Sequence, residues 1–319
     1  MTAHPELSAT MDRLYRLAEK AAATDVNICI SGETGTGKGV LAKHIHLCGD
    51  RSDKPFLRVN CAALPDQLLE SMLFGHEAGA FTDARTARRG LFRAAHGGTL
   101  FLDEIGDMPI RQQAKLLHAI EQKRVRPLGR NTEIPVDVRI IAATNRDLRN
   151  EAMEGVFRQD LYFRLSVIHL EVPPLRHRRE DISALARQFV QRFAGENAEL
   201  SPGAEKMLLR YRWPGNVREL EHVVQRACIF RSNNLIRAEN LNLGNSLRAE
   251  ESPATCDLRT ARRRALRRFE SDYLTGLLET YRGNITQAAA AAGVSRQALH
   301  KMLSRHQIKA NIFRAMRES

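Results

Sequence analysis

Short apolar runs alternate with longer helical stretches through the first half of the chain. Several of these runs are largely apolar, which is typical of strands that are covered on both faces of a sheet. Strands that alternate with helices favour a parallel α/β sheet. Five runs are expected to be its strands: residues 27–31, 56–60, 99–102, 138–143 and 167–170. The sequence therefore predicts an α/β subdomain over residues 1–174.

The pattern changes after the pair Pro173-Pro174. From residue 175 to residue 243 the apolar spacing is helical and no strand is expected, which predicts a smaller helical subdomain. Residues 244–257 are rich in Ser, Glu and Ala, and we interpret them as a linker. Residues 258–319 are the last predicted domain, in which apolar residues recur at a helical spacing: Leu266, Phe269, Tyr273 and Leu277.

A chain of 319 residues with 43% hydrophobic residues can bury the cores of two or three domains. No run of about 18 apolar residues occurs, so we expect no membrane span. The N-terminus lacks the basic and apolar segments of a secretion signal. Scattered cysteines without a CxxC pair favour reduced thiols in a cytoplasmic protein over disulfides or a zinc site. They are Cys29, Cys48, Cys61, Cys228 and Cys256.

The net charge of +12 is concentrated at the C-terminal end. Residues 257–319 contain thirteen Lys or Arg and five Asp or Glu, a balance of +8. A solvated basic surface is the simple interpretation. A helical tail with this bias more often binds nucleic acid, because the basic patch is the electrostatic footprint of such a domain.

A glycine-rich segment follows the first predicted strand and precedes a helical pattern, which is the context that a phosphate-binding P-loop requires. It comprises Gly32, Glu33, Thr34, Gly35, Thr36, Gly37, Lys38 and Gly39. The glycines let backbone N–H groups turn toward phosphate oxygens, and the helix presents its positive end to the same anion. Lys38 is expected to reach the β- and γ-phosphates of ATP. The general signature continues with a Ser or Thr that binds magnesium, where this chain has Gly39.

The predicted strand at residues 99–102 leads into two carboxylates, Asp103 and Glu104. Alone, such a pair would be a solvated strand end, but downstream of a P-loop it predicts the second half of a nucleotide site. Asp103 is expected to hold Mg2+ through water. Glu104 is expected to orient and deprotonate the attacking water. The sequence thus predicts an ATPase that uses ATP and Mg2+.

A Phe-Thr pair flanked by small residues lies between the P-loop and the acidic strand. Such a segment suits the tip of a loop that contacts another molecule better than it suits a core. It comprises Gly79, Ala80, Phe81, Thr82, Asp83 and Ala84. The segment resembles the GAFTGA loop of bacterial enhancer-binding proteins, the AAA+ ATPases that activate RNA polymerase carrying sigma-54. Asp83 stands where that motif has Gly, and we expect it to stiffen or tune the loop rather than disable it.

The resemblance implies roles for further residues of the nucleotide site. Asn60 matches an asparagine that can hold the catalytic glutamate back, and Thr144-Asn145 matches the sensor I motif. The family commonly has Glu at the position of Gly39, so the missing hydroxyl does not by itself exclude activity. Arg218, in a near-complete match to the sensor II motif at residues 213–220, is implied to touch the γ-phosphate from the helical lid.

Arg158 and Arg164 match the arginine-finger region of the family, which implies that they reach the nucleotide of a neighbouring subunit. An active site that spans two subunits requires head-to-tail contacts that close into a ring. The family forms hexamers, so we expect a homo-oligomer, dimeric at rest and hexameric when active, or co-assembly with a paralogue. Because the P-loop begins at Gly32, we expect no receiver or sensing domain before it. The chain therefore resembles the short class of these activators. We expect its activity to be controlled by a separate regulatory protein, by the level at which the chain itself is expressed, or by co-assembly with a paralogue.

The C-terminal pattern predicts a helix-turn-helix, and it resembles the Fis-type domain that ends many enhancer-binding proteins. A short helix begins at residues 284–289, Gly293 marks the turn, and Ser295 can cap the next helix. The residues expected on its DNA-facing side are Ser295, Arg296, Gln297, His300 and Lys301. A small helical bundle for dimerisation is the alternative, and the two roles can coexist.

The favoured hypothesis is an ATP-hydrolysing activator that binds double-stranded DNA upstream of promoters, forms a ring and remodels sigma-54 RNA polymerase. The basic loop at residues 123–130 is expected to assist, either on promoter DNA or as a support for the loop at residues 79–84. The Asp83 departure keeps open a DNA-binding regulator that acts without sigma-54. A AAA+ remodeller or helicase loader would explain the P-loop, but not the Phe-Thr loop together with a Fis-type tail.

Overall fold

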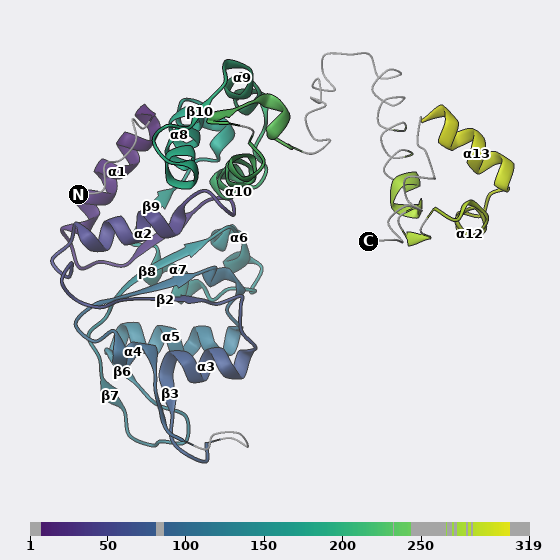
Figure 1. Cartoon of the computed structure of the whole chain (residues 1–319). Helices are drawn as coiled ribbons and strands as arrows, with labels where there is room; N and C mark the ends of the chain where they lie inside the picture. Colours follow the sequence, from purple (N-terminus) through teal and green to yellow (C-terminus); the bar gives the residue numbers. More distant parts are fainter. Residues whose placement is uncertain are drawn as a thin grey trace. The chain divides into compact units, whose positions relative to one another are not determined.

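The computed structural model describes residues 8–80, 86–231 and 233–243. In the C-terminal part it describes residues 266, 270, 273–278, 280, 281 and 283–306. The chain divides into two compact units, Met1–Leu247 and Arg248–Ser319. The first contains the sheet and a helical lid, and the second is a small group of helices (Figure 1). None of the described helices is long and apolar enough to cross a membrane.

The core of the first unit is a sheet of five parallel strands in the order β2-β5-β8-β1-β9. All five strands expected from the sequence are present, each within one residue of its expected bounds. They are β1 (Ile28–Ser31), β2 (Phe56–Asn60), β5 (Thr99–Asp103), β8 (Arg139–Thr144) and β9 (Ile168–Glu171). Parallel strands need crossovers, which bring helices onto both faces. The carboxyl ends of the strands form the edge where open α/β sheets bind ligands.

Helices cover both faces of this sheet, as Figure 1 shows. Side chains alternate along a strand, so Phe101 of β5 packs with α1 and α2, whereas Leu100 and Leu102 pack with the helices of the other face. The first face carries α1 (Ala9–Ala22) and α2 (Lys38–Leu47). The second carries α3 (Asp66–Phe74), α4 (Leu91–Ala94), α5 (Ile110–Gln122) and α7 (Gln159–Leu165). The 3-10 turn η1 (Ile105–Asp107) and α6 (Leu148–Met153) lie between these elements in sequence.

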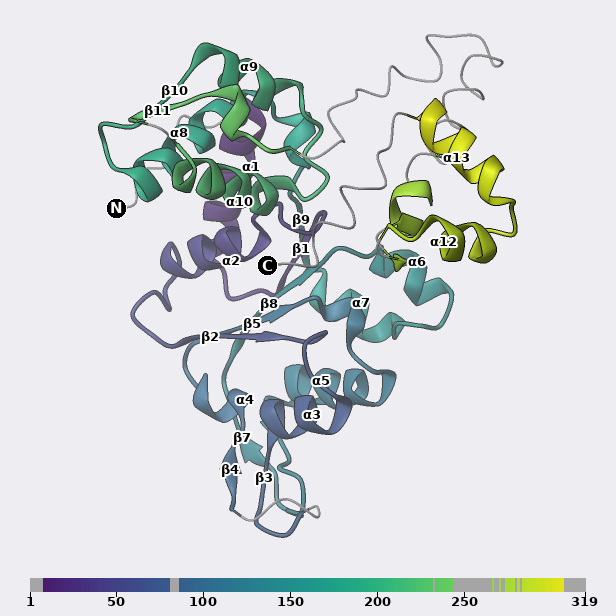
Figure 2. The same ribbon diagram turned by 45° about the vertical axis from the view of Figure 1, so that its right-hand side comes forward.

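Two short antiparallel pairs lie side by side at one end of the α/β subdomain (Figure 2). One consists of β3 (Gly75–His76) and β4 (Arg88–Arg89), and the other of β6 (Arg124–Val125) and β7 (Ile134–Pro135). His76 forms a bridge with Leu128, and the backbone N–H of Glu77 donates to the Leu128 carbonyl at 3.0 Å. The basic loop therefore supports the base of the hairpin that carries residues 79–84.

The lid packs its own core around Trp213, which is fully buried and donates Nε1–H to the Leu208 carbonyl at 2.9 Å. Its helical elements are η2 (Leu175–His177), α8 (Glu180–Ala194), α9 (Pro202–Arg210), α10 (Asn216–Ile229) and η3 (Ala238–Asn240). The expectation that strands are absent from this region is wrong. A parallel pair, β10 (Glu199–Leu200) with β11 (Leu235–Ile236), joins the lid's loops. Strands of two residues are too short to produce a recognisable alternation in the sequence.

The second unit contains α12 (Ile285–Ala291) and α13 (Arg296–Arg305) around a small apolar core. Leu274 and Leu278 are buried in this core with Leu299 and Leu303. The predicted apolar stripe is only partly correct, because Leu266 and Tyr273 are exposed and Leu277 is half-buried, while Phe269 lies outside the described residues. The spacing of apolar residues does not by itself show which of two adjacent apolar faces a helix buries.

Candidate functional site

The P-loop connects the end of β1 to the first residue of α2. Its backbone takes the left-handed region at Gly35, with φ +80°, and at Gly37, with φ +105°. Only glycine adopts these angles without strain, so the loop can wrap closely around an anion. The Gly37 carbonyl accepts hydrogen bonds from Val40 and Leu41, which starts α2 directly behind the loop. The positive end of a ten-residue helix thus points toward the loop.

Lys38 lies inside this loop and is buried, with 5% of its surface exposed. Its Nζ donates to the Gly32 carbonyl at 2.8 Å and to the Glu33 carbonyl at 3.3 Å. The same nitrogen lies 3.6 Å from Glu104 Oε1. A buried ammonium that is held by loop carbonyls and by one carboxylate fits the phosphate-binding role that the sequence predicts.

Glu104 follows β5 in the left-handed conformation, with φ +52°, which is uncommon for a residue other than glycine. Its Oε2 accepts the backbone N–H of Asn145 at 3.1 Å. Asn145 in turn donates its side-chain amide to Thr34 Oγ1 at 3.1 Å. Thr144 contributes through its backbone, because its carbonyl accepts the N–H of Gly32 at 3.2 Å. The structure therefore brings the P-loop, the acidic strand end and the end of β8 together at one edge of the sheet.

Asn60 ends β2 directly opposite Asp103 of β5. Its side-chain oxygen accepts the backbone N–H of Ala62 at 2.9 Å. Among the described contacts, none joins Asn60 to Glu104, which is held by Lys38 and Asn145 instead. The restraint of Glu104 by Asn60 stays a prediction.

Asp103 is nearly buried, and its carboxylate accepts a hydrogen bond of 2.6 Å from Nη2 of Arg58 on β2. Sequence reasoning missed Arg58, because an arginine in a strand gives no motif. Gly39 supplies no side chain to the site, so Asp103 is the carboxylate there that fits Mg2+, and Glu104 lies next to it in sequence. The donor set of Lys38, loop amides and two carboxylates fits ATP with Mg2+.

The lid contacts the P-loop through Glu33. Nη1 and Nη2 of Arg176 bond the two oxygens of Glu33 at 2.7 and 2.6 Å, and the Asn216 amide donates to Glu33 Oε2 at 3.1 Å. These hydrogen bonds, that from Arg176 first, lower the pKa of Glu33 to about 2. Asn216 is fully buried and also accepts the Leu175 N–H at 2.8 Å. The Glu33 side chain thus belongs to the lid contact, and only its backbone belongs to the phosphate loop.

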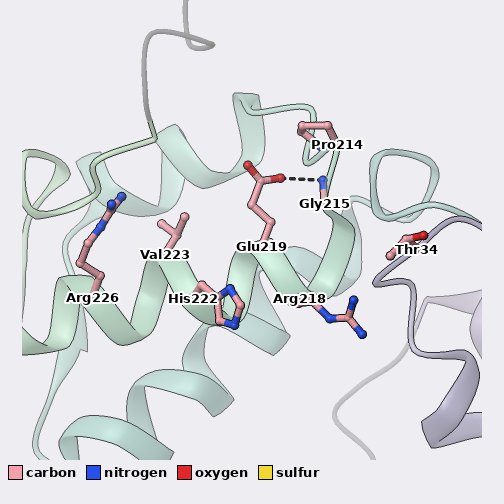
Figure 3. Close-up of a pocket in the computed structure, with 8 residues that line it drawn as sticks. All are labelled: Thr34, Pro214, Gly215, Arg218, Glu219, His222, Val223 and Arg226. Atoms are coloured by element: carbon pink, nitrogen blue, oxygen red, sulfur yellow. Dashed lines mark hydrogen bonds between the residues drawn. The ribbon is translucent and has the colours of Figure 1, made fainter. Parts of the chain in front are cut away.

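A second lid contact forms where α10 begins. The Gly35 carbonyl accepts the N–H groups of Val217 at 3.0 Å and Arg218 at 3.3 Å. A cavity of about 490 Å³ lies beside Thr34 along α10. Figure 3 shows Arg218 leaving α10 toward the side where Thr34 lies. The arrangement is consistent with the predicted approach of Arg218 to a bound nucleotide.

Arg178 is a further lid residue that sequence reasoning missed. Its Nη2 donates to the Thr36 carbonyl at 2.6 Å, and its Nη1 lies 3.7 Å from Asp181 Oδ2. Asp181 also accepts the backbone N–H of Ser8 at 2.5 Å, at the start of α1. The only sequence feature that points to Arg178 is the arginine-rich stretch at residues 176–179, and this stretch does not indicate which groups the arginine contacts.

The two candidate finger arginines lie on and before α7. Arg158 forms a double hydrogen bond with Asp160, at 3.0 Å from Nε and 2.6 Å from Nη2, and its backbone N–H donates to Gln113. Arg164 is exposed, and its carbonyl accepts the Asn27 amide at 3.0 Å. Neither guanidinium contacts the P-loop of its own subunit among the described contacts. Their role in trans stays a prediction.

Of the segment at residues 79–84, the structure describes Gly79 and Ala80; Phe81, Thr82, Asp83 and Ala84 lie outside the described residues. The base of their hairpin is fixed by His76. Its Nε2 donates to the Thr86 carbonyl at 2.9 Å, and its Nδ1 forms a hydrogen bond of 2.7 Å with the Ser71 hydroxyl. Arg130 of the basic loop pairs with Glu77 at 3.1 Å. The two ends of the predicted contact loop are therefore anchored to α3 and to the basic loop.

The helix-turn-helix has the predicted local structure. Ser295 caps α13 by accepting the Ala298 N–H at 3.1 Å, and Gly293 has φ +67° in the turn. Asn284 caps α12 in the same manner. Four residues of α13 that are predicted to face DNA are all exposed: Arg296, Gln297, His300 and Lys301.

Comparison with known families assigns each part of the chain. A model of the sigma-54 interaction domain matches residues 6–171. A model of the AAA+ ATPase lid domain matches residues 176–256, and one of the Fis family of bacterial regulatory proteins matches residues 265–306.

The chain is 45% identical over 313 residues to the transcriptional regulatory protein GlrR of Escherichia coli (strain K12), covering 96% of this chain and 68% of that protein. It is 45% identical over 314 residues to the regulatory protein AtoC of the same organism, covering 94% of this chain and 67% of that protein. The crystal structure of NtrX from Brucella abortus in complex with ATP is similar with a TM-score of 0.69 and 33% identity, covering 96% of this chain and 69% of that one.

Proposed function

Because this chain belongs to the sigma-54 interaction domain family of AAA+ ATPases, we propose that it couples ATP hydrolysis to the opening of promoters by sigma-54 RNA polymerase. The observation that carries the proposal is the cluster of Lys38, Glu104, Asn145 and Thr34 at the carboxyl edge of the sheet. It combines an anion-binding loop with a carboxylate that is positioned by two independent contacts.

Four side chains at and around this cluster have distinct chemical roles in the proposed reaction. Lys38 and the loop amides would bind the β- and γ-phosphates, and Arg218 would approach the γ-phosphate from the lid. Asp103 would hold Mg2+, which when bound neutralises charge on the transferring phosphoryl group. Glu104 would orient the attacking water and take its proton once Lys38 has turned to the phosphates.

Hydrolysis in this scheme requires a neighbouring subunit. Among the described contacts, neither Arg158 nor Arg164 reaches its own P-loop, and we infer that they stabilise the phosphoryl charge of the adjacent site. Contacts of this head-to-tail kind close into a ring. We propose a hexameric ring that assembles from dimers, and its mass in the presence of a nucleotide analogue tests that assembly.

The nucleotide site also has a direct covalent path to the predicted contact loop. Asn60 lies opposite Asp103, and the chain runs from Asn60 through α3 into the β3–β4 hairpin. A change at the carboxylates would therefore move the hairpin that presents Phe81 and Thr82. The exposed residues of α13 would hold the assembly on double-stranded DNA upstream of the promoter.

Capture of sigma-54 by the full chain with ADP and aluminium fluoride tests this function. Wild type is expected to form a complex that Phe81→Ala loses while it retains ATPase activity. Phe230→Ala is the matched control, since Phe230 is 69% exposed at the end of α10 and should leave capture unchanged. Absence of capture by an active wild-type ATPase would favour a DNA-binding regulator that acts without sigma-54.

A further inference from the structure

Gly39 is the position at which the P-loop signature has a hydroxyl that binds magnesium. A Cβ atom built at Gly39 would lie 3.7 Å from Phe101 Cε1 and 3.8 Å from both Cζ and Nη1 of Arg58. The guanidinium of Arg58 therefore lies where a side chain at position 39 would point. This chain has a permanent cation beside the place where other P-loops have a metal ligand.

Several contacts hold Arg58 there. Side chains alternate along strands, and the β2–β5 register puts Arg58 opposite Phe101 and Asn60 opposite Asp103. Nη2 of Arg58 donates to Asp103 Oδ2 at 2.6 Å, and its Cζ lies 5.7 Å from the centre of the Phe101 ring. The ion pair is asymmetric, because the side chain of Asp103 is 12% exposed and that of Arg58 is 55% exposed.

This asymmetry determines which partner can move. The carboxylate is largely buried inside the site, whereas the long arginine enters from solvent and lies beside Gly39, which has no side chain. A magnesium ion near Asp103 would lie within a few ångströms of the guanidinium, and like charges at that distance repel. The two cations compete for one carboxylate.

We propose that Arg58 is a built-in counter-ion of Asp103 that must turn outward before magnesium and nucleotide bind together. It stabilises the metal-free site and thereby raises the magnesium concentration that the protein needs. This inference rests on the proposed ATPase function, since it assumes that Asp103 serves a bound nucleotide.

The competition between Arg58 and Mg2+ can be tested without turnover. Binding of a fluorescent ADP analogue is measured first in excess chelator and then as Mg2+ is added. Removal of the guanidinium should lower the half-saturating Mg2+ concentration by roughly three- to tenfold in Arg58→Ala, the size typical of a partly exposed ion pair. Arg58→Gln, which keeps the aliphatic stem through Cδ but removes the charge, should shift it in the same direction. Arg58→Lys should stay close to wild type. Arg187→Ala removes an equal charge from a lid ion pair with Glu205 and should change nothing.

An unchanged or higher magnesium requirement in folded Arg58→Ala and Arg58→Gln overturns the proposal. Weaker binding of the analogue in chelator alone also overturns it, because Arg58 would then be a phosphate ligand. Thermal unfolding followed by circular dichroism checks that each variant is folded. Failure of wild type to bind the analogue at any magnesium concentration would instead refute the proposed ATPase function.

Discussion

Glu33 of the P-loop and Arg176 of the lid form a two-pronged ion pair, with N–O distances of 2.7 and 2.6 Å. The two residues are 143 positions apart in sequence, so the pair closes the lid segment onto the nucleotide loop. Asn216 donates a third hydrogen bond to the same carboxylate. The pose of the lid over the P-loop thus depends on a charged group whose protonation can be changed experimentally.

Glu33→Gln should destabilise the first unit at neutral pH. The pKa of Glu33 is about 2 in the fold, below its usual value of 4.5, so its stabilisation is present above pH 4.5 and is lost as pH falls toward 2. Glu33 is 41% exposed, and solvent screening reduces the expected loss to about 1 kcal/mol. Urea unfolding of wild type and Glu33→Gln between pH 7 and pH 2 measures the difference in their free energies of unfolding, which should shrink as pH falls.

Glu239→Gln is the control for this prediction, because Glu239 forms an exposed pair with Arg237 at 3.8 Å. A Glu33→Gln effect of constant size at all pH values would contradict this account.

Asn216→Ala should cost about 2–4 kcal/mol of unfolding free energy. The substitution leaves the buried N–H of Leu175 without an acceptor and places alanine at a φ of +54°. Asn150→Ala is the control, because Asn150 is exposed and, among the described residues, its side chain donates to Glu154 alone; it should stay within about 0.5 kcal/mol of wild type. Equal stability of the two variants would show that Asn216 does not organise the lid junction.

Gly35→Ala should separate the lid from the P-loop. A Cβ at Gly35 would lie 2.4 Å from the Gly215 carbonyl oxygen, in addition to the strain of φ +80°. Gly195→Ala has the same kind of strain, at φ +84°, but open space around the Cβ. Backbone strain should lower the free energy of unfolding of both variants by about 1 kcal/mol. Only Gly35→Ala should also lose affinity for a fluorescent nucleotide. Unchanged affinity in Gly35→Ala would argue against coupling through this contact.

Trp213 is the only tryptophan of the chain and therefore reports on the lid. Because it is fully buried with its Nε1–H on the Leu208 carbonyl, its emission should be blue-shifted in native protein and move to the red as urea unfolds the lid. Comparing the fluorescence transition with that of circular dichroism shows whether lid and sheet unfold together. An emission maximum typical of exposed tryptophan in native buffer would be inconsistent with the lid core described above.

The sequence predicted those parts of the molecule that depend on local patterns. The five strands, the P-loop around Lys38, the two carboxylates at the end of β5 and the cap at Ser295 all come from short motifs or short-range periodicity. Contacts between distant residues were not predictable in this way. Arg58 and Asp103 are 45 positions apart, and Glu33 and Asn216 are 183 apart, so no spacing connects them.

The lid shows the same division between local and distant information. Its helices follow from apolar spacing, but the pair formed by Glu199 and Leu235 joins strands of two residues, which carry no periodicity. Asn216 has a positive φ, which asparagine adopts more readily than most residues, but its hydrogen bonds join Leu175, Glu33 and Thr34, which are far from it in sequence. Such tertiary contacts carry no local sequence pattern.

The central claim is that ATP hydrolysis at Lys38 and Glu104 drives promoter opening by sigma-54 polymerase. Permanganate footprinting of single-stranded thymines, on a sigma-54 promoter with polymerase, the full chain and ATP, measures that opening directly. Wild type should produce the open promoter, and Lys38→Ala should produce none while it still binds DNA through α13. Promoter opening by Lys38→Ala at the wild-type level would contradict the account.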